Sequence, residues 1–167
     1  MRSHTARARL VLSLSLGSLC LIAGCDGADD EEVLFDRDAV LERVADYQTT
    51  HVAANEPVLG SHGAMMQVWL VPDQVDDYLA IVPSDRPELE FPTGTLIIKD
   101  HLDEDGAVFE STVMYKAKPG YSPEGGDWWY GEFDAEGALV EGGPDIVTCF
   151  DCHASAAKSD WIHGLPE

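Results

Sequence analysis

The chain has 167 residues, of which 10 are Lys or Arg and 31 are Asp or Glu, so its formal net charge is −21. Apolar residues make up 45% of the chain, which is too many for a disordered acidic protein and enough for one globular domain. Nucleic-acid binding depends on clustered Lys and Arg, so the composition excludes nucleic acid as a partner.

The N-terminus has the features of an export signal. Three arginines precede an apolar run over residues 10–23, which is too short to span a bilayer. The run ends in Leu21-Ile22-Ala23-Gly24-Cys25, which resembles a bacterial lipobox. We therefore expect residues 1–24 to be a lipoprotein signal peptide and Cys25 to be lipidated; the alternative is a plain secretory signal, which also exports the protein.

Residues 25–32 are rich in Asp and Glu, and we expect them to form a solvated acidic tether. An acidic surface is repelled by anionic headgroups, so contact with the membrane would be through the lipid anchor only. The expected location is the periplasmic side of a bacterial membrane, with the protein anchored through Cys25.

Residues 33–167 are predicted to form one α+β domain. Apolar residues at helical spacing predict a helix from Val33 to about His51, with Asp36 or Asp38 as its N-cap. An apolar strand over 65–71 and a short helix after Pro72-Asp73 follow. The second half alternates strands with turn signals, which indicates antiparallel pairing; the expected strands are 95–102, 107–116, 128–133 and 138–140.

The motif that carries chemistry is Cys149-Phe150-Asp151-Cys152-His153. This is the C-x-x-C-H pattern of covalent c-type haem attachment. One helical turn places both sulfurs on the same side, where they form thioethers with the haem vinyl groups, and the adjacent histidine ligates the iron. The sequence thus predicts a C-terminal haem-binding helix with one covalent haem c, bound by Cys149 and Cys152 with His153 as the metal ligand.

Three other interpretations of the motif agree less well with the sequence. A zinc site needs four ligands, and outside the motif the C-terminal region offers only His163. A thioredoxin-like dithiol belongs beside a βαβ unit, which the predicted antiparallel strands do not provide. A structural disulfide leaves His153 unexplained. Haem attachment accounts for all three residues, and the predicted export agrees with it because haem c is attached outside the cytoplasm.

The ligand on the iron face opposite His153 decides whether the haem transfers electrons or binds small molecules. A strong sixth ligand makes an electron carrier, whereas an open face binds small molecules. Several Met and His residues are of a type that can ligate iron, and their positions in the sequence do not single one out. They are Met65, Met66, Met114, His62, His101 and His163.

Several separated motifs, in order, resemble the cytochrome P-460 family, whose relatives include the cytochromes c′-beta. They are Ser61-His62-Gly63, residues 91–100 (FPTGTLIIKD), 112–116 (TVMYK), 120–130 (GYSPEGGDWWY) and the final CFDCH. The resemblance implies a small, mainly antiparallel β fold, a homodimer, and one haem c whose far side is open to ligands.

In one branch of that family a lysine is cross-linked to the porphyrin, and that branch oxidises hydroxylamine. Lys99 matches this lysine; the alternative is a solvated residue at a strand end. The branch also has a distal acidic residue, and the matching position is near Thr112. Glu110 lies two residues earlier on the same strand face, which makes it the candidate distal base, with a solvated surface carboxylate as the alternative.

Trp128 and Tyr130 share one strand face and Trp129 takes the other, so one of these faces is expected to pack against the haem or in the core. We expect an exported cytochrome that performs redox chemistry on a small nitrogen species, hydroxylamine or NO. The alternatives are a non-catalytic NO or CO binder of the c′-beta kind and a plain electron carrier. The acidic surface favours a basic redox partner.

Overall fold

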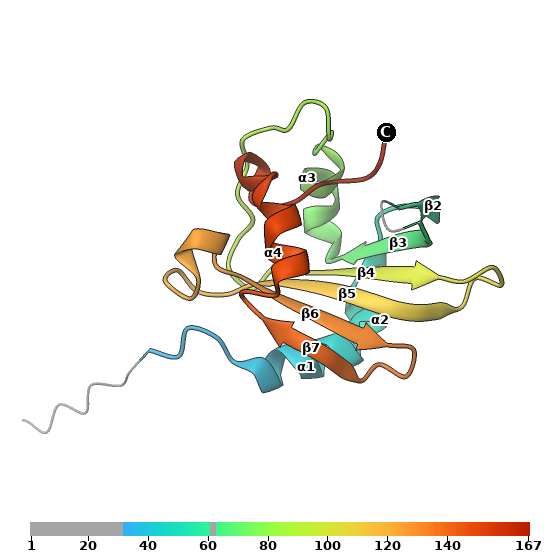
Figure 1. Ribbon diagram of the computed structural model, residues 1–167, viewed down its shortest axis with the longest axis horizontal. Coiled ribbons are helices and arrows are strands. Elements are labelled where there is room, and N and C mark those ends of the chain that lie inside the picture. Colours follow the sequence, from blue (N-terminus) through green and yellow to red (C-terminus); the bar gives the residue numbers. More distant parts are fainter. Residues whose placement is uncertain (1–31, 61–62) are drawn as a thin grey trace, which may run out of the picture. The chain divides into compact units, whose positions relative to one another are not determined.

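The computed structural model describes residues 32–60 and 63–167. The predicted signal peptide, Cys25, His62 and all of the acidic tether except Glu32 lie outside these residues. The described part is built on a seven-stranded sheet in the order β1-β3-β4-β5-β6-β7, with β2 also pairing with β3 (Figure 1). Every pairing is antiparallel, and the helices are few and short. The predicted α+β class with a mainly antiparallel sheet is confirmed.

The predicted strands agree with the observed ones to within a few residues, and two very short strands were missed. The missed strands are β1 (Val52–Ala53) and β2 (Val58–Leu59), which are too short to show an alternation of apolar and polar residues. The five others are β3 (Met65–Leu70), β4 (Leu96–Leu102), β5 (Val108–Lys116), β6 (Trp128–Asp134) and β7 (Leu139–Gly143).

Two hairpin turns use the same local chemistry. The Asp103 carboxylate accepts the backbone N–H groups of Asp105 and Ala107 in the turn between β4 and β5. Asp134 does the same for two N–H groups in the turn between β6 and β7. Each turn is completed by a glycine with positive φ, Gly106 or Gly137. These aspartates and glycines set the register of two hairpins, β4–β5 and β6–β7.

The helical segments are shorter than predicted. The expected helix ending near His51 is divided at Asp46 into α1 (Arg37–Ala45) and α2 (Tyr47–Thr50), because Asp46 leaves helical backbone geometry (φ −125°, ψ 19°). Asp36 is the N-cap of α1. The remaining segments are η1 (Pro72–Gln74), α3 (Val75–Leu79), η2 (Pro123–Gly125), α4 (Val147–Ala154) and η3 (Ala157–Ser159). None of the helices within residues 32–60 and 63–167 is long and apolar enough to cross a bilayer.

One face of the sheet, which we call the closed face, is covered by α1 (Figure 1). Val40 and Val44 of α1 pack in one buried cluster with five residues of the sheet: Leu96, Ile98, Val113, Trp129 and Phe133. The Trp129 ring lies directly over Gly131 and Gly142, where an added Cβ atom would come within 2.5 and 2.6 Å of it. The absence of side chains at these two positions makes room for the Trp129 ring against the sheet.

The opposite face, the cavity face, carries α3, α4 and the C-terminal segment (Figure 1). Its buried residues, including Val68, Leu70, Ile97, Met114 and Tyr130, pack with Tyr78 of α3 and with Ile146 and Ile162 beside α4. Part of the space between this face and α4 is left unfilled, and that space is the candidate site.

Candidate functional site

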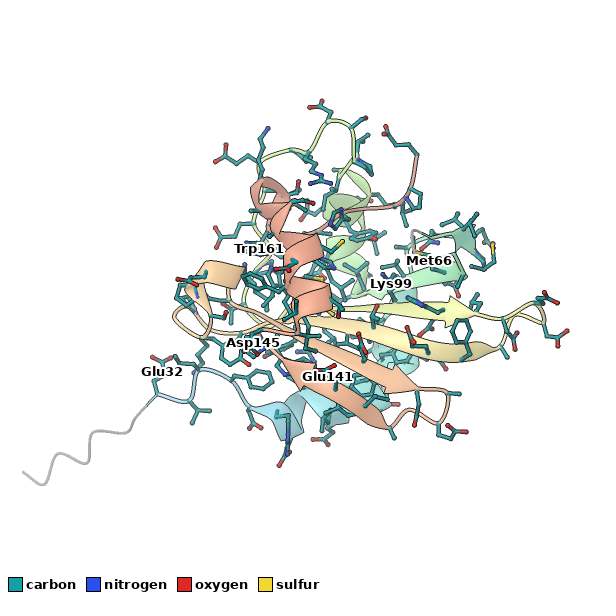
Figure 2. All side chains as sticks on the ribbon, viewed as in Figure 1. Glu32, Met66, Lys99, Glu141, Asp145 and Trp161 are labelled. Carbon is teal, nitrogen blue, oxygen red and sulfur yellow. The ribbon has the colours of Figure 1, made fainter. Side chains whose placement is uncertain are left out.

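A cavity of about 590 Å³ lies between the cavity face, α4 and the C-terminal segment. This volume is within the usual range for a cofactor or small-molecule site. Figure 2 shows Lys99 and Met66 on the side of the sheet that carries α3 and α4. The apolar part of the lining includes Met66, Val68, Ile97, Met114, Tyr130 and Ile162, and the polar part includes Lys99, Glu110, Thr112, Glu132, Cys149, Cys152, His153 and His163.

Strand register explains which polar side chains reach the cavity. Val68, Lys99, Thr112 and Glu132 are successive cross-strand partners on β3, β4, β5 and β6. Since side chains alternate between the two faces, one row of partners points to one face together. Lys99 therefore has an apolar neighbour on one side and Thr112 on the other.

Cys149 and Cys152 lie three residues apart on α4, so both thiols project toward the cavity. Both are free, Cys149 half-buried and Cys152 exposed. Burial raises the pKa of the Cys149 thiol, and the charge of Glu132 adds to this effect. Redox-active dithiols work through a lowered thiol pKa, so the environment of Cys149 is unlike theirs.

His153 is oriented by a backbone carbonyl. Its Nδ1 lies 2.6 Å from the carbonyl oxygen of Trp161. A carbonyl only accepts, so Nδ1 carries the proton and the lone pair of the neutral ring is on Nε2. A histidine that ligates a metal is held in this way, with the second ring nitrogen donating to a carbonyl or carboxylate.

Lys99 lies in the middle of β4 rather than at a strand end, and it is half-buried against the cavity. Burial lowers the pKa of its ammonium group, and the nearby charges of Cys149, Cys152 and Glu110 oppose that effect. A lowered pKa increases the fraction of neutral amine, which is the nucleophilic form.

Two carboxylates line the cavity. Glu110, the predicted distal base, is 43% exposed and lies 3.3 Å from Nδ1 of the buried His101. Glu132 was not predicted. It is the cross-strand partner of Thr112, and its carboxylate lies 3.9 Å from the Cys149 sulfur. The only signal that would have found it is the β5–β6 register, which a single sequence does not specify.

The aromatic residues divide between the faces as their alternation predicts. Tyr130 lines the cavity, Trp129 is in the closed face, and Trp128 is fully buried beside the cavity-face cluster. The Tyr130 hydroxyl is buried and has no hydrogen-bond partner among the described residues. A buried polar atom of this kind points to a group that the protein itself does not supply.

The residues considered as a sixth iron ligand are dispersed. Met66 and Met114 line the cavity, whereas Met65 is 38% exposed at the sheet margin and His101 faces Glu110. His163 lines the cavity near α4, but its ring is engaged elsewhere: Arg86 donates to Nδ1 at 3.2 Å, and Nε2 donates to the Cys152 carbonyl at 3.0 Å. His163 thus satisfies a carbonyl at the end of α4.

These residues fit a haem better than a zinc ion. Among the described residues, no group of three or more His, Cys, Asp or Glu side chains is placed to hold a metal. A porphyrin brings four nitrogen ligands of its own and needs only an axial histidine from the protein. The paired thiols, the oriented His153, the buried Tyr130 hydroxyl and the apolar lining all agree with such a group.

A family model described as Cytochrome P-460 matches residues 44–164. The match begins in α1 and ends beyond His163, so it includes every strand of the sheet and all the cavity-lining residues named above. None of the curated proteins matches the chain.

Proposed function

The chain belongs to the cytochrome P-460 family, a family of haem cytochromes, and from this premise we propose that it carries one covalent haem c and performs redox chemistry on a small nitrogen species. The substrate class is hydroxylamine or NO. The observation that carries the proposal is the cavity itself: one space of about 590 Å³ is lined by Cys149, Cys152 and His153 and also by Lys99 and two carboxylates.

The attachment residues have distinct roles in this proposal. Cys149 and Cys152 hold the haem through thioethers, and His153 ligates the iron through Nε2 while Nδ1 donates to Trp161. The bound haem supplies an iron atom at which a small nitrogen ligand binds and through which electrons leave. The residues of the sheet then determine what surrounds that ligand.

Glu110 and Glu132 are the candidates for taking protons from a nitrogen substrate. Glu110 has His101 at 3.3 Å, and its exposed edge connects the cavity to solvent, so a proton received there has an exit. Glu132 is one strand farther along the sheet, in contact with Cys149. We assign Glu110 as the distal base and Glu132 as the second candidate.

Lys99 is the candidate for a covalent bond to the porphyrin. Its pKa is lowered by burial, and it shares the cavity with the attachment thiols. Both properties favour a neutral amine beside the cofactor. Such a bond would tune the electronic properties of the haem.

A second function is favoured by the apolar lining. Met66, Val68, Ile97 and Met114 would surround a diatomic ligand with apolar atoms, as suits a non-catalytic binder of NO or CO. The two functions differ in what they need from Lys99 and Glu110: catalysis needs both, and gas binding needs neither.

The proposal extends to location and partners. We propose export, cleavage before Cys25 and lipid attachment at that cysteine, with the domain on the periplasmic side of a bacterial membrane. The net charge of −21 favours a basic redox partner, since opposite charges speed encounter. A homodimer is proposed from the family resemblance alone.

The optical spectrum of the protein matured in an exporting host tests this proposal. We expect a covalent haem, and a reduced Soret band that is strongly red-shifted and returns to an ordinary c-type position in Lys99→Ala. Glu110→Gln should lose hydroxylamine oxidation while keeping the optical spectrum of the parent. Glu132→Gln is the matched variant, which tests the second candidate base in the same way. A high-spin spectrum that is identical in the parent and in Lys99→Ala would favour the non-catalytic gas binder. A low-spin spectrum would indicate an electron carrier. Absence of haem would refute the proposal.

A further inference from the structure

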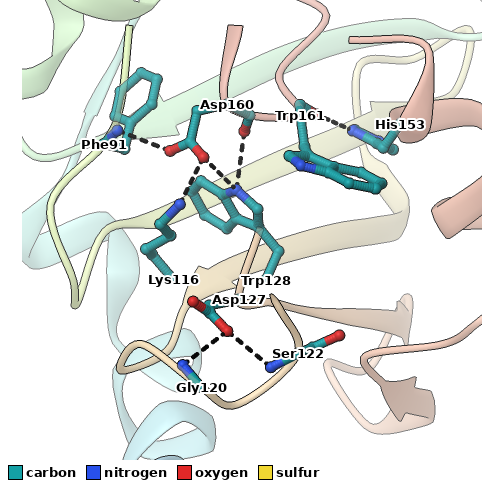
Figure 3. A network of polar contacts seen from close by, with 9 residues as sticks. All are labelled: Phe91, Lys116, Gly120, Ser122, Asp127, Trp128, His153, Asp160 and Trp161. Carbon is teal, nitrogen blue, oxygen red and sulfur yellow. Dashed lines mark hydrogen bonds and ion pairs between the residues drawn. The ribbon is translucent and has the colours of Figure 1, made fainter. Parts of the chain in front are cut away.

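Asp160 is a buried carboxylate seven residues after His153, and it is held from three elements (Figure 3). One oxygen, Oδ1, accepts from the Lys116 ammonium of β5 at 2.5 Å, and Oδ2 accepts from the backbone N–H of Phe91 at 2.7 Å. The side chains of Lys116 and Asp160 are 8% and 6% exposed. Neither residue is among the described residues that line the cavity.

The main chain at Asp160 is held as well. Its carbonyl accepts from the Trp128 indole N–H at 2.9 Å, and the Lys116 ammonium lies over the Trp128 ring (Figure 3). Asp160 and Trp161 both have left-handed backbone conformations, with φ of 50° and 66°. Two successive residues with Cβ atoms do not adopt this conformation without support from their surroundings. The contacts of Asp160 supply that support.

The consequence of this local geometry is the position of one carbonyl. The left-handed pair turns the chain back toward α4, and the Trp161 carbonyl that follows Asp160 accepts from Nδ1 of His153 at 2.6 Å. A hydrogen bond at this nitrogen fixes the orientation of a ligating imidazole and raises its basicity as a ligand. Asp160 is thus connected to Nε2 of His153 through one peptide unit and one ring.

We propose that Asp160, held by Lys116 and Trp128, is a positioning residue for His153 and sets the strength of its bond to the iron. The inference rests on the proposed haem at Cys149, Cys152 and His153. A role in stability alone is a poor account of the ion pair, because burying two charges costs nearly as much as their attraction returns. The pair is better explained by the orientation that it imposes.

Two variants of the haem-loaded protein separate positioning from a simple effect of charge. Asp160→Asn leaves an unpaired cation and Lys116→Met an unpaired anion, so the electric field at the haem changes in opposite directions. Both variants loosen the Trp161 carbonyl, weaken its hydrogen bond to His153 and lower the basicity of the ligand. Since a basic ligand stabilises ferric iron, both should raise the reduction potential. We expect the ferric-to-ferrous equilibrium to change about tenfold, or about 59 mV for one electron.

The iron–histidine stretching frequency, measured by resonance Raman spectroscopy of the ferrous protein, should fall in both variants. Asp100→Asn is the matched control. Asp100 is also a buried carboxylate that accepts two side-chain hydrogen bonds, from Tyr47 and Ser111, but it points to the closed face. It should lower stability and leave both haem measurements at the parent values.

Potentials that shift in opposite directions in the two variants, with an unchanged stretching frequency, would overturn the inference in favour of a field effect. If either variant fails to accumulate with haem, Trp128→Phe decides. It removes the indole N–H that donates to Asp160 and keeps an aromatic ring and both charges of the ion pair. A smaller shift in the same direction supports positioning, and no shift overturns it. A parent protein without haem would overturn the proposed function together with this inference, whereas unchanged haem properties in loaded variants overturn this inference alone.

Discussion

The two faces of the sheet are built from alternate residues of the same strands, yet they are packed differently. On the closed face, Leu96, Ile98, Val113 and Trp129 are buried and pack with α1 in one apolar cluster. On the cavity face, the intervening residues Ile97, Lys99, Thr112 and Met114 border a space of about 590 Å³. Unfilled apolar volume destabilises a protein, so a cavity of this size next to a packed core indicates that a ligand belongs there. The comparison predicts that substitutions on the closed face change mainly the stability, and that substitutions on the cavity face change mainly the binding of the proposed haem and its ligand.

The largest effect should come from Cys149 and Cys152, the two thiols of the cavity face that we propose attach the haem. In a Lys99→Ala background, which removes the proposed lysine bond to the porphyrin, the double variant Cys149→Ser/Cys152→Ser removes both described thiols and should lose all covalent haem. Denaturing gels stained for haem would measure the loss, and circular dichroism would show that the sheet is retained. Single variants, each keeping one thiol, are the controls. Covalent haem in the double variant would contradict the assignment.

Trp129→Ala should have the largest effect on the closed face. The ring is 2% exposed and lies over Gly131 and Gly142, so its removal should lower the free energy of unfolding by about 3–5 kcal/mol. Urea unfolding measures this change. The haem spectrum of the folded variant should equal that of the parent, and a changed spectrum would show that the two faces are coupled.

Two neighbouring substitutions sharpen the comparison further. Val113→Phe enlarges a side chain of the packed closed face and should lower the unfolding free energy by about 1–3 kcal/mol. Thr112→Phe enlarges a side chain that borders the cavity and should change it by less than about 1 kcal/mol, while reducing affinity for NO or CO. Unfolding and ligand titration measure both quantities. Equal losses of stability in Val113→Phe and Thr112→Phe would show that the cavity does not accommodate a larger side chain at position 112.

The smallest expected effect concerns pH and the buried His51 at the end of α2. Burial lowers the pKa of His51 from its ordinary value of 6.5, and the positive charge of Arg43 adds to the effect. Below about pH 6.5, His51 therefore binds a proton in the unfolded chain but not in the folded chain. The free energy of unfolding falls as the pH falls toward the lowered pKa of the folded state.

His51→Gln removes this contribution, and thermal unfolding between pH 5 and 7.5 would measure the difference in slope. The variant should lose less stability on acidification than the parent. Equal slopes would contradict the assignment, because the other titrating groups are the same in both proteins.

Local features of the chain determined more of the fold than long-range ones. The five longer strands were predictable because alternation and turn residues such as Asp103 and Gly106 act within a few residues of one another. The division of the first helix at Asp46 was not predicted, because apolar spacing continues across it. The strands β1 and β2 depend on pairing with β3 and have too few residues to carry a pattern.

In the candidate site, too, the residues with a local signal were predictable and those that depend on distant neighbours were not. Cys149, Cys152 and His153 were predicted to attach haem because their spacing within one helical turn is itself the signal. Lys99 came from the family resemblance, and its place on the cavity face came from register. Glu132 and Asp160 were missed because their significance depends on neighbours that are distant in the chain: Thr112 across the β5–β6 pair for Glu132, and Lys116 for Asp160.

The sequence by itself determined the class of fold and the family and predicted haem attachment, since each depends on residues close together or on motifs in a fixed order. The tertiary structure alone decided which face of the sheet borders the cavity. It also decided which carboxylates border the cavity and which carbonyl orients His153. These properties depend on strand register and on contacts between distant segments, so they exist only in the folded chain.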